Sequence, residues 1–155
     1  MKKLLATLVL PIAALACGGE MSTSDRLDAI RNGKARLTAS LDQLQALARA
    51  GHLTNWQSHA MKLDEAKSLM NSIGCALEAL PQGDATRARL VLELAPSAAG
   101  IESLIARLRE NRLVIQRASY YDEVTRVARE VRERKQRVIE AIQMALAGSP
   151  ARNGA

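Results

Sequence analysis

The sequence predicts an all-α protein, an antiparallel helical bundle that follows a cleaved N-terminal segment. Apolar residues recur at spacings of three and four along most of the chain, as they do on one face of a helix. Glycine and proline gather at a few positions, which divide the chain into long helical stretches. Aromatic residues make up only 2% of the chain, so the core is expected to consist of Leu, Ile, Val and Ala.

The first predicted helix begins after Ser24, a favourable N-cap, and runs from Asp25 to about Ala50. Gly51 follows it in the C′ position. The apolar side of this helix consists of Leu27, Ile30, Leu37, Leu41, Leu44 and Leu47. Lys34 interrupts that side, and we expect its ammonium group to reach solvent along the bundle surface.

The second predicted helix starts with a capping box formed by Thr54 and Gln57, and it ends near Leu80, before Pro81. One side of this helix carries Trp56, His59, Leu63, Ala66, Met70, Ile73, Leu77 and Leu80. The opposite side is also small or apolar, with Met61, Ser68, Ser72, Cys75 and Ala79. A helix with two sides that can pack belongs between neighbours, which favours a bundle over a helical hairpin.

A third helical stretch follows the turn capped by Asp84, and Pro96 either kinks it or separates two helices. No glycine or proline occurs over 101–147, although the apolar register changes near 118–121. Two architectures fit: four antiparallel helices with a tight corner at 118–121, or three helices of which the last is long. A final helix of about 50 residues would span roughly 75 Å. The absence of helix breakers favours the long final helix.

The N-terminus has the layout of a secretory signal peptide. Lys2 and Lys3 are followed by thirteen uncharged residues, 4–16, too few to cross a bilayer, which takes about 17–25. We therefore predict a signal peptide over 1–16 and a flexible tether over 17–24. The helical domain is expected over 25–147, and a disordered tail over 148–155.

The four residues Ala14-Leu15-Ala16-Cys17 resemble the lipobox of bacterial lipoproteins. The resemblance implies lipidation of Cys17: its sulfur receives a diacylglyceryl group, and cleavage before it exposes an amino terminus that is acylated. Inner-membrane lipoproteins often carry Asp directly after the cysteine, where this chain has Gly18. The resemblance therefore implies that the protein is located in the outer membrane. Ala14 departs from the commoner Leu. Ordinary cleavage after Ala16 therefore remains the alternative, and it gives a soluble periplasmic or secreted protein.

The chain has two cysteines, Cys17 and Cys75. An acylated Cys17 cannot form a disulfide, whereas a soluble product allows a bridge between the two residues. A leftover thiol can also pair between two copies. The interpretation we favour for Cys75 is a small, unreactive residue packed between helices.

Composition and motifs indicate neither an enzyme nor a nucleic-acid binder. The formal charge of +6 is basic, but single-strand binding needs a series of aromatic platforms, which this chain lacks. The two histidines, His52 and His59, lack metal-ligand spacing, and the inward sides of the helices offer almost no further ligands. We expect no catalytic residues, metal or cofactor. His59 is interpreted as a boundary histidine, hydrogen-bonded beside Trp56 at the open end of the bundle.

These features predict a lipid-anchored helical bundle that faces the periplasm and acts by binding envelope proteins. Its role would be that of an accessory, scaffold or exclusion component of an envelope or secretion assembly, and self-association into homo-oligomers is left open. Trp56, Tyr120 and Tyr121 are the candidate partner-binding residues, because they are the only large aromatic anchors. The alternative function is that of a soluble binding module for a small ligand, a lipid or an envelope polymer.

Overall fold

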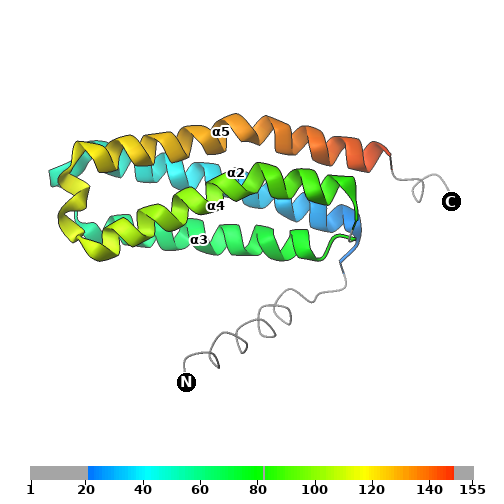
Figure 1. Cartoon of the computed structure of the whole chain (residues 1–155), viewed down its shortest axis with the longest axis horizontal. Coiled ribbons are helices and arrows are strands. Elements are labelled where there is room, and N and C mark those ends of the chain that lie inside the picture. The colour runs from blue at the N-terminus through cyan, green and yellow to red at the C-terminus, as the bar shows by residue number, and fades with distance from the viewer. Residues whose placement is uncertain (1–20, 82, 149–155) are drawn as a thin grey trace, which may run out of the picture.

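The computed structural model describes residues 21–81 and 83–148, which form an antiparallel bundle of four α-helices (Figure 1). The elements are α2 (Thr23–Ala50), η1 (Gly51–Leu53), α3 (Trp56–Glu78), α4 (Ala85–Glu110), η2 (Arg112–Gln116) and α5 (Ala118–Ala147). The prediction of an all-α antiparallel bundle is confirmed. The predicted signal peptide and Cys17 lie outside the described residues, as does most of the predicted tail.

The two ends of the bundle differ in how the chain passes through them (Figure 1). At one end, here called the corner end, the 3-10 helices η1 and η2 join successive helices. At the other, here called the terminal end, lie Met21, the turn between α3 and α4, and Gly148. Between the ends, the core is a single cluster made almost entirely of Leu, Ile, Val and Ala. Most residues of the predicted apolar stripes are buried in it.

The long final helix favoured by the sequence is wrong, because the chain reverses between α4 and α5. Asn111 ends α4, and its side-chain oxygen accepts a hydrogen bond from the Leu113 N–H at 3.0 Å. The next two residues of η2, Val114 and Ile115, are buried in the core. An asparagine side chain and two apolar anchors therefore make the turn without glycine or proline, and they make it before 118–121.

Pro96 neither ends α4 nor separates two helices, since α4 continues through it. Proline has no N–H, so the carbonyl of Leu92 receives no hydrogen bond from within the helix. Leu92 is exposed, which leaves that part of the helix open to water. The cost of the missing bond is thereby kept small.

Two helix starts differ from the predicted ones. Ser22 rather than Ser24 caps α2, and Asn55 rather than Thr54 caps α3. Asp84 caps α4 as predicted, with its carboxylate accepting from the backbone of the first turn. The side chain of Thr54 is instead part of a buried hydrogen-bond chain described below.

Close helix contacts depend on glycine at two positions. A Cβ at Gly100 of α4 would lie 2.8 Å from Cγ2 of Val127 on α5, and a Cβ at Gly33 of α2 would lie 2.8 Å from Cγ1 of Ile73 on α3. Both distances are shorter than side-chain carbons tolerate. Gly74 of α3, in contrast, has no such neighbour within 4 Å.

We predict that Gly100→Ala lowers the free energy of unfolding by about 1 kcal/mol. Overpacking against a β-branched side chain costs about 1–3 kcal/mol, and the higher helix propensity of alanine returns less than about 1 kcal/mol of it. Gly74→Ala is the matched control, expected to stabilise by about 0.5–1 kcal/mol. Urea unfolding followed by circular dichroism at 222 nm measures both. Equal stability of the two variants would contradict the close α4–α5 contact.

Candidate functional site

The three aromatic residues predicted to bind a partner lie at the corner end, and the structure corrects the prediction for one of them. Tyr120 is 0% exposed, so it cannot contact a partner. Trp56 is half-buried, and the guanidinium carbon of Arg112 lies 4.0 Å from its ring centroid, which is a cation–π contact. Tyr121 is half-buried, and a hydrogen bond from Arg49 lowers the pKa of its hydroxyl. A role in recognition stays a prediction for Trp56 and Tyr121.

His59 is not a boundary residue beside Trp56, because it is 0% exposed and hydrogen-bonded on both ring nitrogens. Its Nε2 lies 2.8 Å from the Thr54 hydroxyl, and its Nδ1 lies 3.1 Å from the Tyr120 hydroxyl. Thr54 donates its only hydroxyl proton to the Gly51 carbonyl at 2.7 Å. Nε2 must therefore donate to Thr54, which leaves Nδ1 to accept from Tyr120.

This chain of hydrogen bonds is a structural clamp rather than a reactive centre. Burial lowers the pKa of His59 and raises the pKa of Tyr120, so both side chains are neutral near pH 7. Every proton and lone pair that the clamp needs is supplied from within the protein. The clamp links α3, the turn that contains η1, and the first turn of α5. It therefore holds the corner end closed.

Lys34 does not reach solvent as expected: it is 1% exposed, and its Nζ has no hydrogen-bond partner within the described residues. Arg134, near it, pairs with Glu93 of α4 at 3.0 Å and with Glu130 of α5 at 3.5 Å. Burial, and then the charge of Arg134, lower the pKa of Lys34 to about 8, while the two carboxylates act in the opposite direction. Lys34 is thus a buried amine that loses its proton easily.

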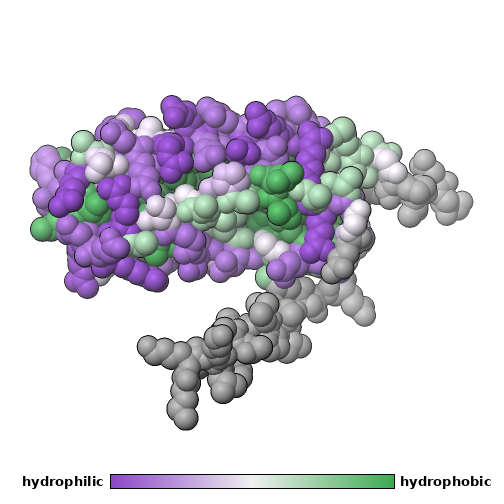
Figure 2. Space-filling model, viewed as in Figure 1, coloured by the Kyte–Doolittle hydropathy of each residue, from purple (hydrophilic) through white to green (hydrophobic). Residues whose placement is uncertain are grey.

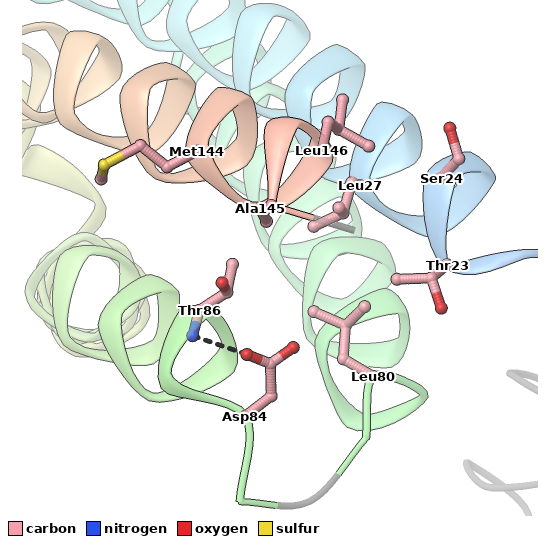
Figure 3. A pocket seen from close by; sticks show the side chains of 10 residues that line it. Thr23, Ser24, Leu27, Leu80, Asp84, Thr86, Met144, Ala145 and Leu146 are labelled. Atoms are coloured by element: carbon pink, nitrogen blue, oxygen red, sulfur yellow. Dashed lines mark hydrogen bonds between the residues drawn. The ribbon is translucent and has the colours of Figure 1, made fainter. Parts of the chain in front are cut away.

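A cavity of about 400 Å³ opens at the terminal end (Figure 3). Its lining comes from the first turns of α2, the turn before α4 and the last turns of α5, and consists of Thr23, Ser24, Leu27, Leu80, Asp84, Thr86, Met144, Ala145, Leu146 and Gly148. Figure 3 shows Asp84 accepting the hydrogen bond from the Thr86 N–H, at 2.9 Å. The volume of this cavity lies within the range of small-molecule sites, about 300–1,000 Å³. Its mixed lining suits an amphipathic ligand.

A second feature lies along the side of the bundle, where α4 exposes apolar side chains next to α3 (Figure 2). Leu92 is 72% exposed and Val91 is 46% exposed. Beside them a groove of about 240 Å³ runs between α3 and α4, with largely apolar walls. We call this region the α3–α4 surface, and it consists of Met70, Gly74, Ala88, Val91, Leu92, Ala95 and Ala98.

Sequence reasoning missed the α3–α4 surface, although a signal for it was present. Ala85, Ala88, Leu92, Ala95 and Ala99 follow one another at spacings of three and four. They form a second stripe on α4, and all of them are exposed. The second side of α3, expected to pack against a neighbour, is in fact largely exposed at Met61, Ser68 and Ser72.

Cys75 is half-buried on α3 and is disulfide-bonded. The favoured interpretation, a small unreactive residue packed between helices, is therefore wrong. Cys17 lies outside the described residues, so its acylation stays a prediction.

Within residues 21–81 and 83–148, no group of three or more His, Cys, Asp or Glu side chains is placed to hold a metal ion. In the same part of the chain, no helix is both long enough and apolar enough to cross a membrane. Comparison with protein-family models, with curated proteins and with solved structures finds no match to this chain. The choice between candidate sites therefore depends on geometry and surface chemistry.

The buried amine of Lys34 predicts that stability rises between pH 7.5 and 9.5. In this window the unfolded chain still holds the proton that the folded chain gives up at about pH 8, so raising the pH favours folding. Lys34→Met removes the rise, and at pH 7 it stabilises the fold by about 1–3 kcal/mol, since no charge is then buried. Urea unfolding across this window measures the effect, with the exposed Lys135→Met as control. An unchanged pH slope in Lys34→Met would show that the amine is solvated.

Proposed function

We propose that this protein is a lipid-anchored component of a bacterial cell envelope and that it acts by binding other proteins through the α3–α4 surface. The observation that carries the proposal is the exposure of Leu92 and Val91 beside an apolar groove. Burying such side chains gains about 25 cal/mol for each square ångström removed from water. Continuous exposed apolar surface is typical of sites where proteins meet. The role would be that of an accessory, scaffold or exclusion component of an envelope or secretion assembly.

The proposed anchor fits this use of the α3–α4 surface. Met21 is the fourth residue after Cys17, and four residue steps of extended chain span at most about 14 Å. An acylated Cys17 would thus keep the terminal end of the bundle close to the outer membrane, on its periplasmic side. The α3–α4 surface begins near that end, at Ala88, and continues along the side of the bundle. Partners held in the same membrane could reach it.

A photo-crosslinking amino acid at position 92 tests the proposal in intact cells. We expect it to join the protein covalently to a partner in the envelope, because Leu92 lies at the centre of the α3–α4 surface. The same amino acid at Met61, which is 63% exposed on the far side of α3, is the control and should give no adduct. Equal crosslinking at both positions, or none at either, would contradict the proposed surface.

A second candidate function has its own support. The cavity of about 400 Å³ at the terminal end, together with the disulfide-bonded Cys75, favours a soluble, exported binding module for a small amphipathic ligand or lipid. A Cys17 whose sulfur carries a lipid is not available for a disulfide, so in the anchored form Cys75 would have to pair between two copies of the chain. The two functions therefore make opposite predictions about the mature protein.

The intact mass of the protein recovered from envelopes decides between them. The anchored form predicts a chain that starts at Cys17 and carries the added mass of its acyl groups. The soluble form predicts an unmodified chain that becomes two hydrogens heavier on reduction of one disulfide. Finding that second result would end the lipid-anchor proposal. A chain that still carries Met1 would contradict both functions, since both require export and cleavage.

A further inference from the structure

We propose that the corner end of the bundle contacts an anionic phospholipid membrane, into which Leu53 and Leu113 insert. The inference goes beyond the proposed function, since it concerns a different surface and holds whether or not the chain is acylated. Three observations support it: two leucines that project at one tip, basic side chains beside them, and an end face that is too small for a protein interface.

The two leucines project from neighbouring turns. Leu53 of η1 is 79% exposed, and Leu113 of η2 is 64% exposed. The turns lie side by side at the corner end (Figure 1), where a Cβ on Gly51 would lie 3.9 Å from the carbonyl oxygen of Ile115. The core at this end is filled by Val114 and Ile115 instead. Leucines exposed on tight turns suit insertion between lipid headgroups, where each side chain is removed from water by itself.

The charge of these two turns complements an anionic surface. Neither 51–57 nor 111–119 contains an aspartate or a glutamate, whereas the two segments together contain His52, Arg112 and Arg117. All three side chains are exposed. An arginine beside an anionic membrane can keep its guanidinium group among the phosphates while apolar side chains go deeper. Carboxylates would be repelled by the same phosphates, so their absence favours lipid at this end.

Just outside the two turns, the charges of the helices are equal in number. Arg49 and Arg109 are exposed there, and so are the carboxylates of Glu110 and Asp122. The excess of positive charge at the corner end therefore comes from the turns themselves, next to the two leucines.

The chain's only tryptophan lies at this end as well. Trp56 begins α3 directly after the η1 turn, and the guanidinium carbon of Arg112 lies 4.0 Å from its ring centroid. Tryptophan is typical of the boundary between membrane and water, because its ring is apolar and its N–H is polar. Trp56 is thus placed where the headgroups would lie when the leucines insert.

The size of the corner end favours a membrane over a protein partner. Four packed helices, each about 10 Å across, form an end face of about 20 Å by 20 Å, or about 400 Å². A stable protein interface buries about 800 Å² on each partner. The end face alone is too small for such an interface, whereas a bilayer accepts inserted side chains one at a time.

The fluorescence of Trp56 tests the inference on the full-length protein recovered from cells. The protein is incorporated into or mixed with vesicles of phosphatidylcholine, with or without an equal part of phosphatidylglycerol, whose acyl chains carry bromine, a quencher of tryptophan. We expect quenching only in the vesicles that contain phosphatidylglycerol, and we expect high salt to remove it, because salt screens the attraction of the arginines. An acylated chain would be anchored at the terminal end, and α4 alone spans about 39 Å, so Trp56 reports the corner end.

Serine variants identify the inserted side chains. Leu53→Ser combined with Leu113→Ser should abolish the quenching, since both inserted side chains become polar. Leu92→Ser is the matched control, because Leu92 is 72% exposed but belongs to the α3–α4 surface, and this variant should be quenched like the wild type. Circular dichroism at 222 nm verifies that every variant is folded.

Four results would overturn the inference. One is a wild-type protein that is not quenched in the anionic vesicles, and a second is equal quenching in the double serine variant. A third is equal quenching without phosphatidylglycerol, since the arginines would then have no role. The fourth is a photo-crosslinking amino acid at position 53 that captures an envelope protein rather than lipid. The proposed function is tested separately, by crosslinking at position 92.

Discussion

The architecture depends on the reversal of the chain between α4 and α5. A reversal without glycine must be held by packing and by hydrogen bonds from side chains. Here Val114 and Ile115 insert into the core, and the side-chain oxygen of Asn111 caps the start of η2 by accepting a hydrogen bond from the Leu113 N–H. Next to this turn, the clamp formed by His59 and Tyr120 fixes the start of α5 to α3. Because α5 is turned back in this way, it covers α2 and α4 and completes the core.

The reversal also decides how charge is distributed over the bundle. The basic residues of α5 lie beside acidic residues of its neighbours, and they pair with them: Arg132 with Asp42 of α2 at 3.1 Å, and Arg134 with Glu93 of α4 at 3.0 Å. Much of the positive charge of α5 is therefore balanced within the bundle. The outward side of α4 has the opposite character, since Leu92 and the alanines around it carry no charge. Apolar contact is thus concentrated on α4.

Much of the fold could be predicted from local signals. Leucine spacing located α2 and α3, Asp84 marked the start of α4, and Gly51 marked the end of α2. The turn at Asn111 could not be predicted from the positions of glycine and proline, because it is stabilised by the burial of Val114 and Ile115 in a core formed by distant helices. The pairing of His59 with Tyr120 joins residues 61 positions apart, and no local pattern encodes it. Lys34 was misjudged for a related reason, because burial depends on which helices surround it.

The candidate site was harder to predict, because alanine fits both a core and a surface, so a stripe of alanines did not stand out. The small size of alanine also suits a weak interface, because small side chains let two backbones approach closely but bury little apolar area. Such an interface would be ineffective between proteins free in solution. An acylated Cys17 would change that, since proteins confined to one membrane meet at a much higher effective concentration. A weak apolar surface such as the one centred on Leu92 would then be sufficient, and binding would stay reversible. The proposed lipid anchor and the α3–α4 surface would therefore function together.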